Sequence, residues 1–193
     1  MSLYLRFTKF GKRIKLAISE KILPHYTYEE WVRWEGRWEL IEGIPYAMRP
    51  SAEPKHQLVT GNIACEFKGA LKHCSNCKAY LPLDYVIEND TILEPDLLVV
   101  CGKINKKFLD FPPALVVEVL SPSTALKDRH TKFELYQSQG VKYYLIVSPD
   151  TEEVEVYAME NGVYELKSKG RNFSHSFIFE DDCIADIDFK EIW

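Results

Sequence analysis

Apolar residues recur along the chain with periods that predict alternating helices and strands. Over residues 56–71 they return at intervals of four, four and three, which places one face of a helix against a core. A second helix is expected over residues 125–139, where Gly140 closes it. The hydroxyls of Ser121-Pro122-Ser123-Thr124 supply its capping groups.

Strand-like segments fill the intervals between these helices. Residues 81–88 alternate apolar and polar side chains, whereas 97–100 and 114–117 are uninterrupted apolar runs, typical of strands that are covered on both faces. We expect these three strands at the centre of the sheet. Another strand is expected over residues 143–147.

Turn signals predict two hairpins and one short helix. Residues 38–48 form a hairpin that turns at Gly43-Ile44-Pro45, and residues 154–166 form one that turns at Asn161-Gly162. A capping box of Thr27 and Glu30 begins a short helix. The element order predicts an α/β fold, a mixed sheet flanked by helices with an added β-hairpin. We expect one domain over residues 25–193, preceded by an N-terminal arm over residues 1–24.

Composition and charge restrict the possible class of protein. The 193 residues are 46% apolar and 27% charged, and the formal net charge is −5. This charge argues against a protein that coats nucleic acids through global attraction. With no long apolar run and no signal-peptide core, we expect a soluble, cytoplasmic protein without a membrane span. The five cysteines are an odd number in mixed segments, so no structural disulfide is expected.

Two acidic residues lie where folding alone does not explain them. Asp96 begins one predicted central strand and Glu118 interrupts another. Burying an isolated carboxylate costs several kcal/mol unless a cation, hydrogen bonds or a proton compensates it. If the strands are neighbours, Asp96 and Glu118 form a pair of hard oxygen ligands for a divalent cation such as Mg²⁺. The alternative is a strand-end aspartate and a glutamate held by helix dipoles or a salt bridge.

The helix that follows Glu118 carries a polar stripe. Asp128 and Lys132 are four residues apart and Tyr136 continues the line, so an acid, a base and a phenol share one helix face. A solvent-facing ion pair is the simpler explanation for such spacing. The stripe nevertheless begins at the strand end that carries Glu118.

These residues resemble a known family. The similarity covers roughly residues 25–190 and rests on the segments Tyr26-Thr27-Tyr28-Glu29, Glu39-Leu40-Ile41-Glu42-Gly43, His56, Pro95-Asp96, Glu118, Ser121-Pro122-Ser123-Thr124, Asp128, Lys132, Tyr136, Gly140-Val141 and Pro149. Together they resemble the Uma-type restriction endonucleases of the PD-(D/E)XK nuclease superfamily. The resemblance implies a restriction-endonuclease-like fold. It also implies that Asp96, Glu118 and the backbone carbonyl of Val119 hold Mg²⁺ or Mn²⁺, which activates water for attack on a DNA phosphodiester.

The sequence departs from the superfamily pattern at the lysine of the strand motif. In a Glu-x-Lys motif the lysine follows the glutamate by two residues on the same strand face, and here that position is Leu120. The resemblance implies that Lys132, on the following helix, takes the place of this lysine. Its long stem allows the charge to reach back over the strand end.

The same comparison suggests accessory residues. Glu39 matches an acidic position of the first hairpin, and its neighbour Glu42 alternates to the opposite face. His56 matches a family position where it would contact a phosphate or a metal-bound water, or simply a backbone group. Asp128 and Tyr136 are the other accessory residues that the resemblance suggests. A zinc site at His73, Cys74 and Cys77 is not favoured, because no second pair of ligands accompanies them.

The sequence therefore predicts a metal-dependent DNA endonuclease. Asp96 and Glu118 are its expected metal ligands and Lys132 its positioning cation. Cleavage of both DNA strands favours a homodimer. Two alternatives stay open: a catalytically inactive DNA-binding relative, and a structural or protein-interaction domain in which the acidic residues pair with Lys132. The best candidate for a DNA-facing basic patch is the set Lys103, Lys106, Lys107, Lys127, Arg129 and Lys132.

Overall fold

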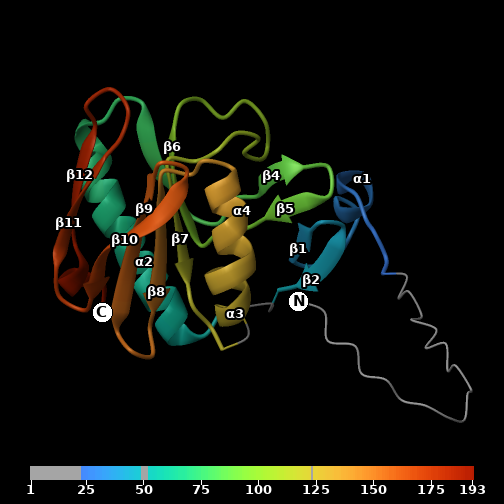
Figure 1. Ribbon diagram of the computed structural model, residues 1–193, viewed down its shortest axis with the longest axis horizontal. Helices are drawn as coiled ribbons and strands as arrows, with labels where there is room; N and C mark the ends of the chain where they lie inside the picture. Colours follow the sequence, from blue (N-terminus) through green and yellow to red (C-terminus); the bar gives the residue numbers. More distant parts are fainter. Residues whose placement is uncertain (1–22, 49–51, 123) are drawn as a thin grey trace, which may run out of the picture.

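The computed structural model describes residues 23–48, 52–122 and 124–193 (Figure 1). The predicted arm over residues 1–24 lies almost entirely outside this range, so its boundary stays a prediction. Ser123 of the predicted capping segment also lies outside it. In the described part of the chain, no helix has both the length and the apolar character needed to cross a membrane.

The largest element is a six-stranded mixed sheet with the order β10-β9-β8-β7-β6-β3. Its strands are β3 (Cys77–Tyr80), β6 (Leu97–Cys101), β7 (Leu115–Val119), β8 (Tyr143–Ser148), β9 (Glu153–Glu160) and β10 (Val163–Gly170). Strands β7 and β8 are parallel, and the other pairs are antiparallel. All five residues of β7 are buried, as expected for an apolar run covered on both faces.

Helices cover the two faces of this sheet (Figure 1). Helix α2 (Pro54–Ala70) packs Val59, Ile63 and Phe67 against Val117 and its neighbours, and a short 3₁₀ turn η1 (Leu71–His73) follows it. The opposite face is covered by α3 (Ala125–Lys127), a π-helical turn η2 (Asp128–Lys132) and α4 (Phe133–Ser138). The helices predicted over residues 56–71 and 125–139 are thus present, and the second contains one π turn.

A second sheet of four strands has the order β2-β1-β5-β4. It contains β1 (Trp38–Ile41), β2 (Ile44–Ala47), β4 (Tyr85–Glu88) and β5 (Thr91–Leu93), and α1 (Tyr28–Trp31) precedes it in the chain. The expectation that residues 81–88 form a central strand of the main sheet is wrong. Only residues 85–88 form a strand, which lies at the edge of the small sheet, and Leu81 is exposed. Strand β3 takes the place beside β6 instead.

The predicted turns are confirmed with one shift. The backbone of both Asn161 and Gly162 has positive φ, as the primed turn of a two-residue hairpin requires. The first hairpin turns at Glu42 and Gly43, where φ is 49° and 76°, so Pro45 lies within β2 rather than in the turn. The capping box is present: the backbone N–H of Thr27 donates to Glu30 Oε2 at 2.9 Å.

The C-terminal segment forms a separate hairpin. Strands β11 (Ser174–Ile178) and β12 (Ile184–Asp188) pair with each other, and a 3₁₀ turn η3 (Phe189–Ile192) follows. The expectation of no structural disulfide is wrong, because Cys74 bonds to Cys183 and Cys77 to Cys101. The first bridge joins residues 109 positions apart, a pairing that only the tertiary fold creates. Cys65 is free and exposed.

Candidate active site

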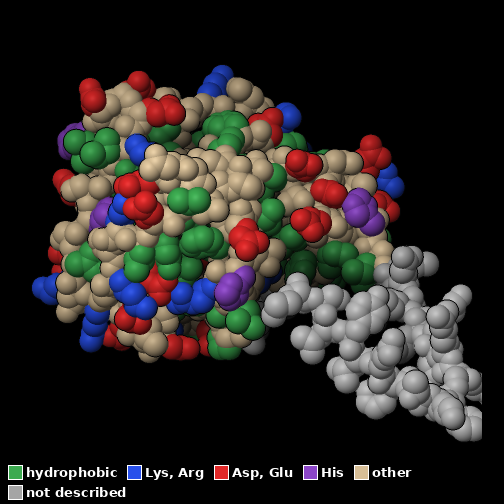
Figure 2. Space-filling model, in the orientation of Figure 1, with side chains coloured by type: hydrophobic (Ala, Val, Ile, Leu, Met, Phe, Trp, Pro, Cys, Tyr) green, Lys and Arg blue, Asp and Glu red, His purple; other side chains and the backbone are tan. Residues whose placement is uncertain are grey.

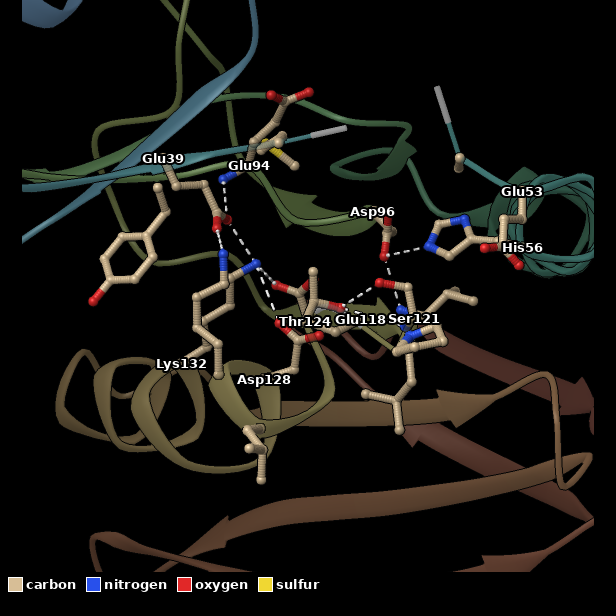
Figure 3. Close-up of a pocket in the computed structure, with 18 of the residues that line it drawn as sticks. Glu39, Glu53, His56, Glu94, Asp96, Glu118, Ser121, Thr124, Asp128 and Lys132 are labelled. Carbon is tan, nitrogen blue, oxygen red and sulfur yellow. Dashed lines mark hydrogen bonds and ion pairs between the residues drawn. The ribbon is translucent and has the colours of Figure 1, made fainter. Parts of the chain in front are cut away.

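Asp96 and Glu118 come together across two central strands. Leu97 of β6 pairs with Val117 of β7, which places the preceding Asp96 opposite the following Glu118. The Asp96 carboxylate accepts a hydrogen bond from the backbone N–H of Val119 at 2.8 Å, and this bond fixes its orientation. Both residues line a cleft of about 530 Å³ between the main sheet, α2 and the small sheet (Figure 3).

Lys132 lies among three carboxylates in this cleft. Its Nζ atom is 2.6 Å from Glu39 Oε1, 2.9 Å from Glu118 Oε1 and 3.5 Å from Asp128 Oδ1 (Figure 3). Its side chain is 3% exposed. The predicted stripe of acid and base therefore faces the strand end rather than solvent.

Two tyrosines complete the buried network. The Tyr136 hydroxyl donates to Glu118 Oε1 at 2.8 Å, and the Tyr144 hydroxyl donates to the backbone oxygen of Asp128 at 2.8 Å. Both rings are fully buried. These bonds hold Glu118 and the π turn at fixed positions.

Glu39 enters the site from the small sheet. Strand β1 places its carboxylate fully inside the protein, where it accepts a hydrogen bond from the backbone N–H of Glu94 at 3.1 Å. Lys127 also pairs with its Oε2 atom. The ammonium of Lys127 lies 5.2 Å from the centre of the Tyr46 ring, at the more open side of the cleft. Its partner was not predicted from the sequence, which assigned Lys127 only to a basic patch.

His56 lies in the first turn of α2 and faces Asp96. Its Nε2 atom is 3.4 Å from Asp96 Oδ2 (Figure 3). Burial of the ring opposes protonation, but hydrogen bonding and charge from Asp96, together with a hydrogen bond to the Val119 backbone, raise the His56 pKa. The side chains of His56 and Asp96 are 15% and 18% exposed, so they form the accessible part of the site. Glu118, Lys132 and Glu39 lie beneath them.

Carboxylates outnumber ammonium groups around Lys132. Glu39, Asp96, Glu118 and Asp128 provide four carboxylates, against the two ammonium groups of Lys127 and Lys132. Burial and repulsion by the other three carboxylates raise the pKa of Glu118 well above its usual range, despite the attraction of Lys132. Burial likewise raises the pKa of Asp128.

The lysines keep the other side of the network charged. Burial opposes the ionisation of Glu39, but Lys132 and Lys127 outweigh this effect and lower its pKa. Burial opposes the charge on Lys132, and its carboxylate partners raise its pKa well above the usual range. Lys132 and Glu39 therefore form the firm ion pair, and Glu118 is the carboxylate that most readily takes a proton.

Residues 26–182 match the model of a family described as "Uma2: Putative restriction endonuclease". The chain belongs to the Uma2 family. It is 30% identical, over 177 residues, to the uncharacterized protein slr1290 of Synechocystis. The matched residues make up 81% of this chain and 92% of that protein. The predicted family resemblance is confirmed.

A solved structure shares the fold of this Uma2 chain. It is a crystal structure titled as a "putative nuclease belonging to DUF820" from Anabaena variabilis, with a TM-score of 0.69 and 18% sequence identity. The match covers 86% of this chain and 97% of the other. The predicted mixed α/β fold is therefore confirmed.

The donor set of the Uma2 site suits a hard divalent cation. Among the described residues, no three His, Cys, Asp or Glu side chains are arranged to hold a metal. Mg²⁺ commonly binds through one or two carboxylates and keeps several waters, which the oxygens of Asp96 and Glu118 with the Val119 carbonyl would satisfy.

The predicted basic patch carries less free charge than the sequence indicates. Lys106 pairs with Asp110 at 2.7 Å and Arg129 with Glu155 at 2.9 Å, while Lys127 and Lys132 belong to the cleft. On the face shown in Figure 2, basic and acidic side chains are interspersed. The cleft, rather than this patch, is the best candidate for a functional site.

Proposed function

We propose that this Uma2 protein is a metal-dependent DNA endonuclease. The observation that carries the proposal is the convergence of Asp96, Glu118 and Lys132 in one cleft. Membership of a family described as "Putative restriction endonuclease" supports the same reaction. Asp96, Glu118 and the Val119 carbonyl would hold Mg²⁺ or Mn²⁺, whose chemistry there is to activate water for attack on a phosphodiester.

The surrounding residues each have a proposed task. Lys132 places a positive charge beside Glu118, where negative charge develops on a phosphate during hydrolysis. Tyr136 fixes the Glu118 carboxylate through its hydroxyl. Glu39 and Asp128 hold the Lys132 ammonium in place. A freely moving lysine would not supply its charge at a fixed point, so this anchoring is part of the site.

The accessible edge of the cleft is the proposed contact with DNA. His56 reaches this edge beside Asp96 and would hydrogen-bond a phosphate oxygen or a bound water. Lys127, with a side chain that is 16% exposed, would contact an adjacent phosphate. Cleavage of both strands would require two such sites, so we further propose a homodimer, which analytical ultracentrifugation would test.

A plasmid relaxation assay tests the proposed activity. Supercoiled DNA with Mg²⁺ or Mn²⁺ should be nicked by the wild type, and excess EDTA should stop the reaction. Asp96→Asn should lose the activity, because the amide cannot provide an anionic ligand. Asp186→Asn is the matched control: this exposed aspartate of β12 lies outside the cleft and accepts a hydrogen bond from Ser176.

The outcomes separate the candidate functions. Nicking that survives in Asp96→Asn, or that persists in EDTA, would contradict the proposal. Salt-sensitive DNA binding without nicking would favour a non-catalytic DNA-binding protein. Absence of both would favour the structural role, in which the acidic residues serve only as partners of Lys132.

A further inference from the structure

The small sheet contributes an aromatic side chain to the mouth of the cleft. Tyr46 of β2 lies directly opposite Glu39 of β1, and residues opposite each other in an antiparallel pair project from the same face of a sheet. Both side chains line the cleft, but Glu39 is fully buried whereas 39% of Tyr46 is exposed. Tyr46 therefore belongs to the rim of the cleft, and Glu39 to its buried floor.

Helix α3 contributes a second apolar side chain to the rim. Leu126 lines the same cleft and is 78% exposed. The next residue, Lys127, places its ammonium 5.2 Å from the centre of the Tyr46 ring. Single exposed apolar residues are common on protein surfaces. Here, however, an aromatic ring, an aliphatic side chain and a cation share the rim of one cleft, which is a combination suited to a nucleotide.

The cations that line the cleft already have carboxylate partners. Within the described part of the chain, each lining Lys or Arg forms an ion pair: Arg37 with Glu94, Lys55 with Glu152, Lys127 with Glu39, and Lys132 with Glu39 and Glu118. Electrostatic binding of duplex DNA depends on cations that neutralise several phosphates. Attraction for phosphates is therefore weak at this cleft, and contacts with the bases must supply much of the affinity for DNA.

An aromatic ring at a rim selects for bases that are not paired. Within a duplex the faces of each base are covered by neighbouring base pairs, so a protein ring can stack only on a base that is single-stranded or flipped out. The groups beneath the rim impose the same selection. Glu118 and Lys132 are only 4% and 3% exposed, so a phosphate must enter the cleft to reach them, and a flexible single strand can bend to do so.

We propose that Tyr46 stacks on an unpaired base beside the phosphate that enters the cleft, while Leu126 packs against the same nucleotide. Single-stranded or locally unpaired DNA is then the preferred substrate. That the entering phosphate is the one cleaved rests on the proposed function. The stacking contact itself requires no metal and no cleavage, so binding in EDTA measures it directly.

Fluorescence anisotropy in EDTA tests the preference with a labelled single strand of about 12 nucleotides and with the same strand in a duplex. The wild type should bind the single strand about tenfold or more tightly than the duplex. Tyr46→Ala should weaken single-strand binding about 5- to 150-fold, as loss of one stacked base does, and leave duplex binding unchanged. Tyr46→Phe keeps the ring and should stay within about twofold of the wild type.

An abasic strand of the same length separates stacking from a structural role of Tyr46. This strand keeps every phosphate but presents no base, so the wild type and Tyr46→Ala should bind it equally. The matched control is Leu166→Ala, which removes an exposed apolar side chain of β10 outside the cleft. It should bind all three strands like the wild type.

The outcomes keep this inference apart from the proposed function. Equal binding of single strand and duplex, unchanged single-strand binding in Tyr46→Ala, or no binding of either form would overturn the inference. An equal loss in Tyr46→Ala on the abasic strand would overturn it too. Nicking of plasmid alongside any of these results would leave the proposed nuclease intact. Single-strand binding that depends on Tyr46, without cleavage, would support the inference and remove the nuclease function.

Discussion

Replacing Glu118 with glutamine should change how stability depends on pH. The Glu118 carboxyl is buried, and it shares the Lys132 ammonium with Glu39 and Asp128. Burial and repulsion by these carboxylates raise its pKa well above the usual value of 4.5. The folded, metal-free protein therefore retains a proton on Glu118 at pH values where the unfolded chain has released it.

The sign and size of the effect follow from proton linkage. Because the native state binds one proton more than the unfolded state, the free energy of unfolding falls as pH rises. A difference of one proton corresponds to about 1.4 kcal/mol per pH unit. The stabilisation is complete below pH 4.5 and is lost as pH rises through the elevated pKa of the folded protein. Glutamine cannot titrate, so Glu118→Gln should lack this component.

Urea denaturation in EDTA at one-unit steps from pH 5 to pH 8 measures the difference. Between wild type and Glu118→Gln, the slope of unfolding free energy against pH should differ by up to about 1.4 kcal/mol per unit. Mg²⁺ should reduce this difference, because a bound dication replaces the proton. Parallel slopes in the two proteins without metal would refute the assignment of an elevated pKa to Glu118.

Two further predictions concern stability outside the cleft. Replacing Cys183 with serine opens a bridge between residues 109 positions apart, and replacing Cys101 opens one that spans 24. The chain-entropy model gives costs of roughly 5 and 3.5 kcal/mol, so urea denaturation of the oxidised proteins should find Cys183→Ser the less stable; the reverse order would contradict this. Burial opposes ionisation of Glu155, but hydrogen bonds from Arg129 and two other side chains lower its pKa to about 2. The ionised Glu155 should stabilise the fold above pH 4.5, and this stabilisation should be lost as pH falls towards 2. The free energy of unfolding should therefore fall less steeply with decreasing pH in Glu155→Gln than in the wild type. An unchanged pH dependence would exclude this role.

Local patterns in the sequence predicted much of the central fold. Strands β6 and β7 and helix α2 were predicted because each buries residues that are close together in the sequence. Their apolar runs and apolar period are therefore visible in the sequence itself. The Asn161-Gly162 turn requires positive φ, which its residue types favour. The prediction that residues 81–88 form a central strand was wrong because an alternating pattern is compatible with any half-covered sheet. Both disulfides depend on long-range contacts that no local pattern contains.

The site was predictable only in part for the same reason. The apolar runs place Asp96 and Glu118 near each other once the two strands pair. Lys127 was missed because helical periodicity separates it from the stripe of Lys132. The π turn closes hydrogen bonds between residues five apart, which brings positions 127 and 132 towards the same side. Nothing in the local sequence indicates that turn.

The contacts of Lys132 explain how its ammonium is buried beside the carboxylates. Leu120 occupies the position of a strand-borne lysine, and it packs among apolar residues. Lys132, on the helix, reaches Glu39 and Asp128 as well as Glu118. Three partners offset the large cost of burying an ammonium, which one carboxylate alone would offset poorly. The helical position of Lys132 therefore allows its ammonium to be buried, and burial fixes its charge beside the proposed metal ligands.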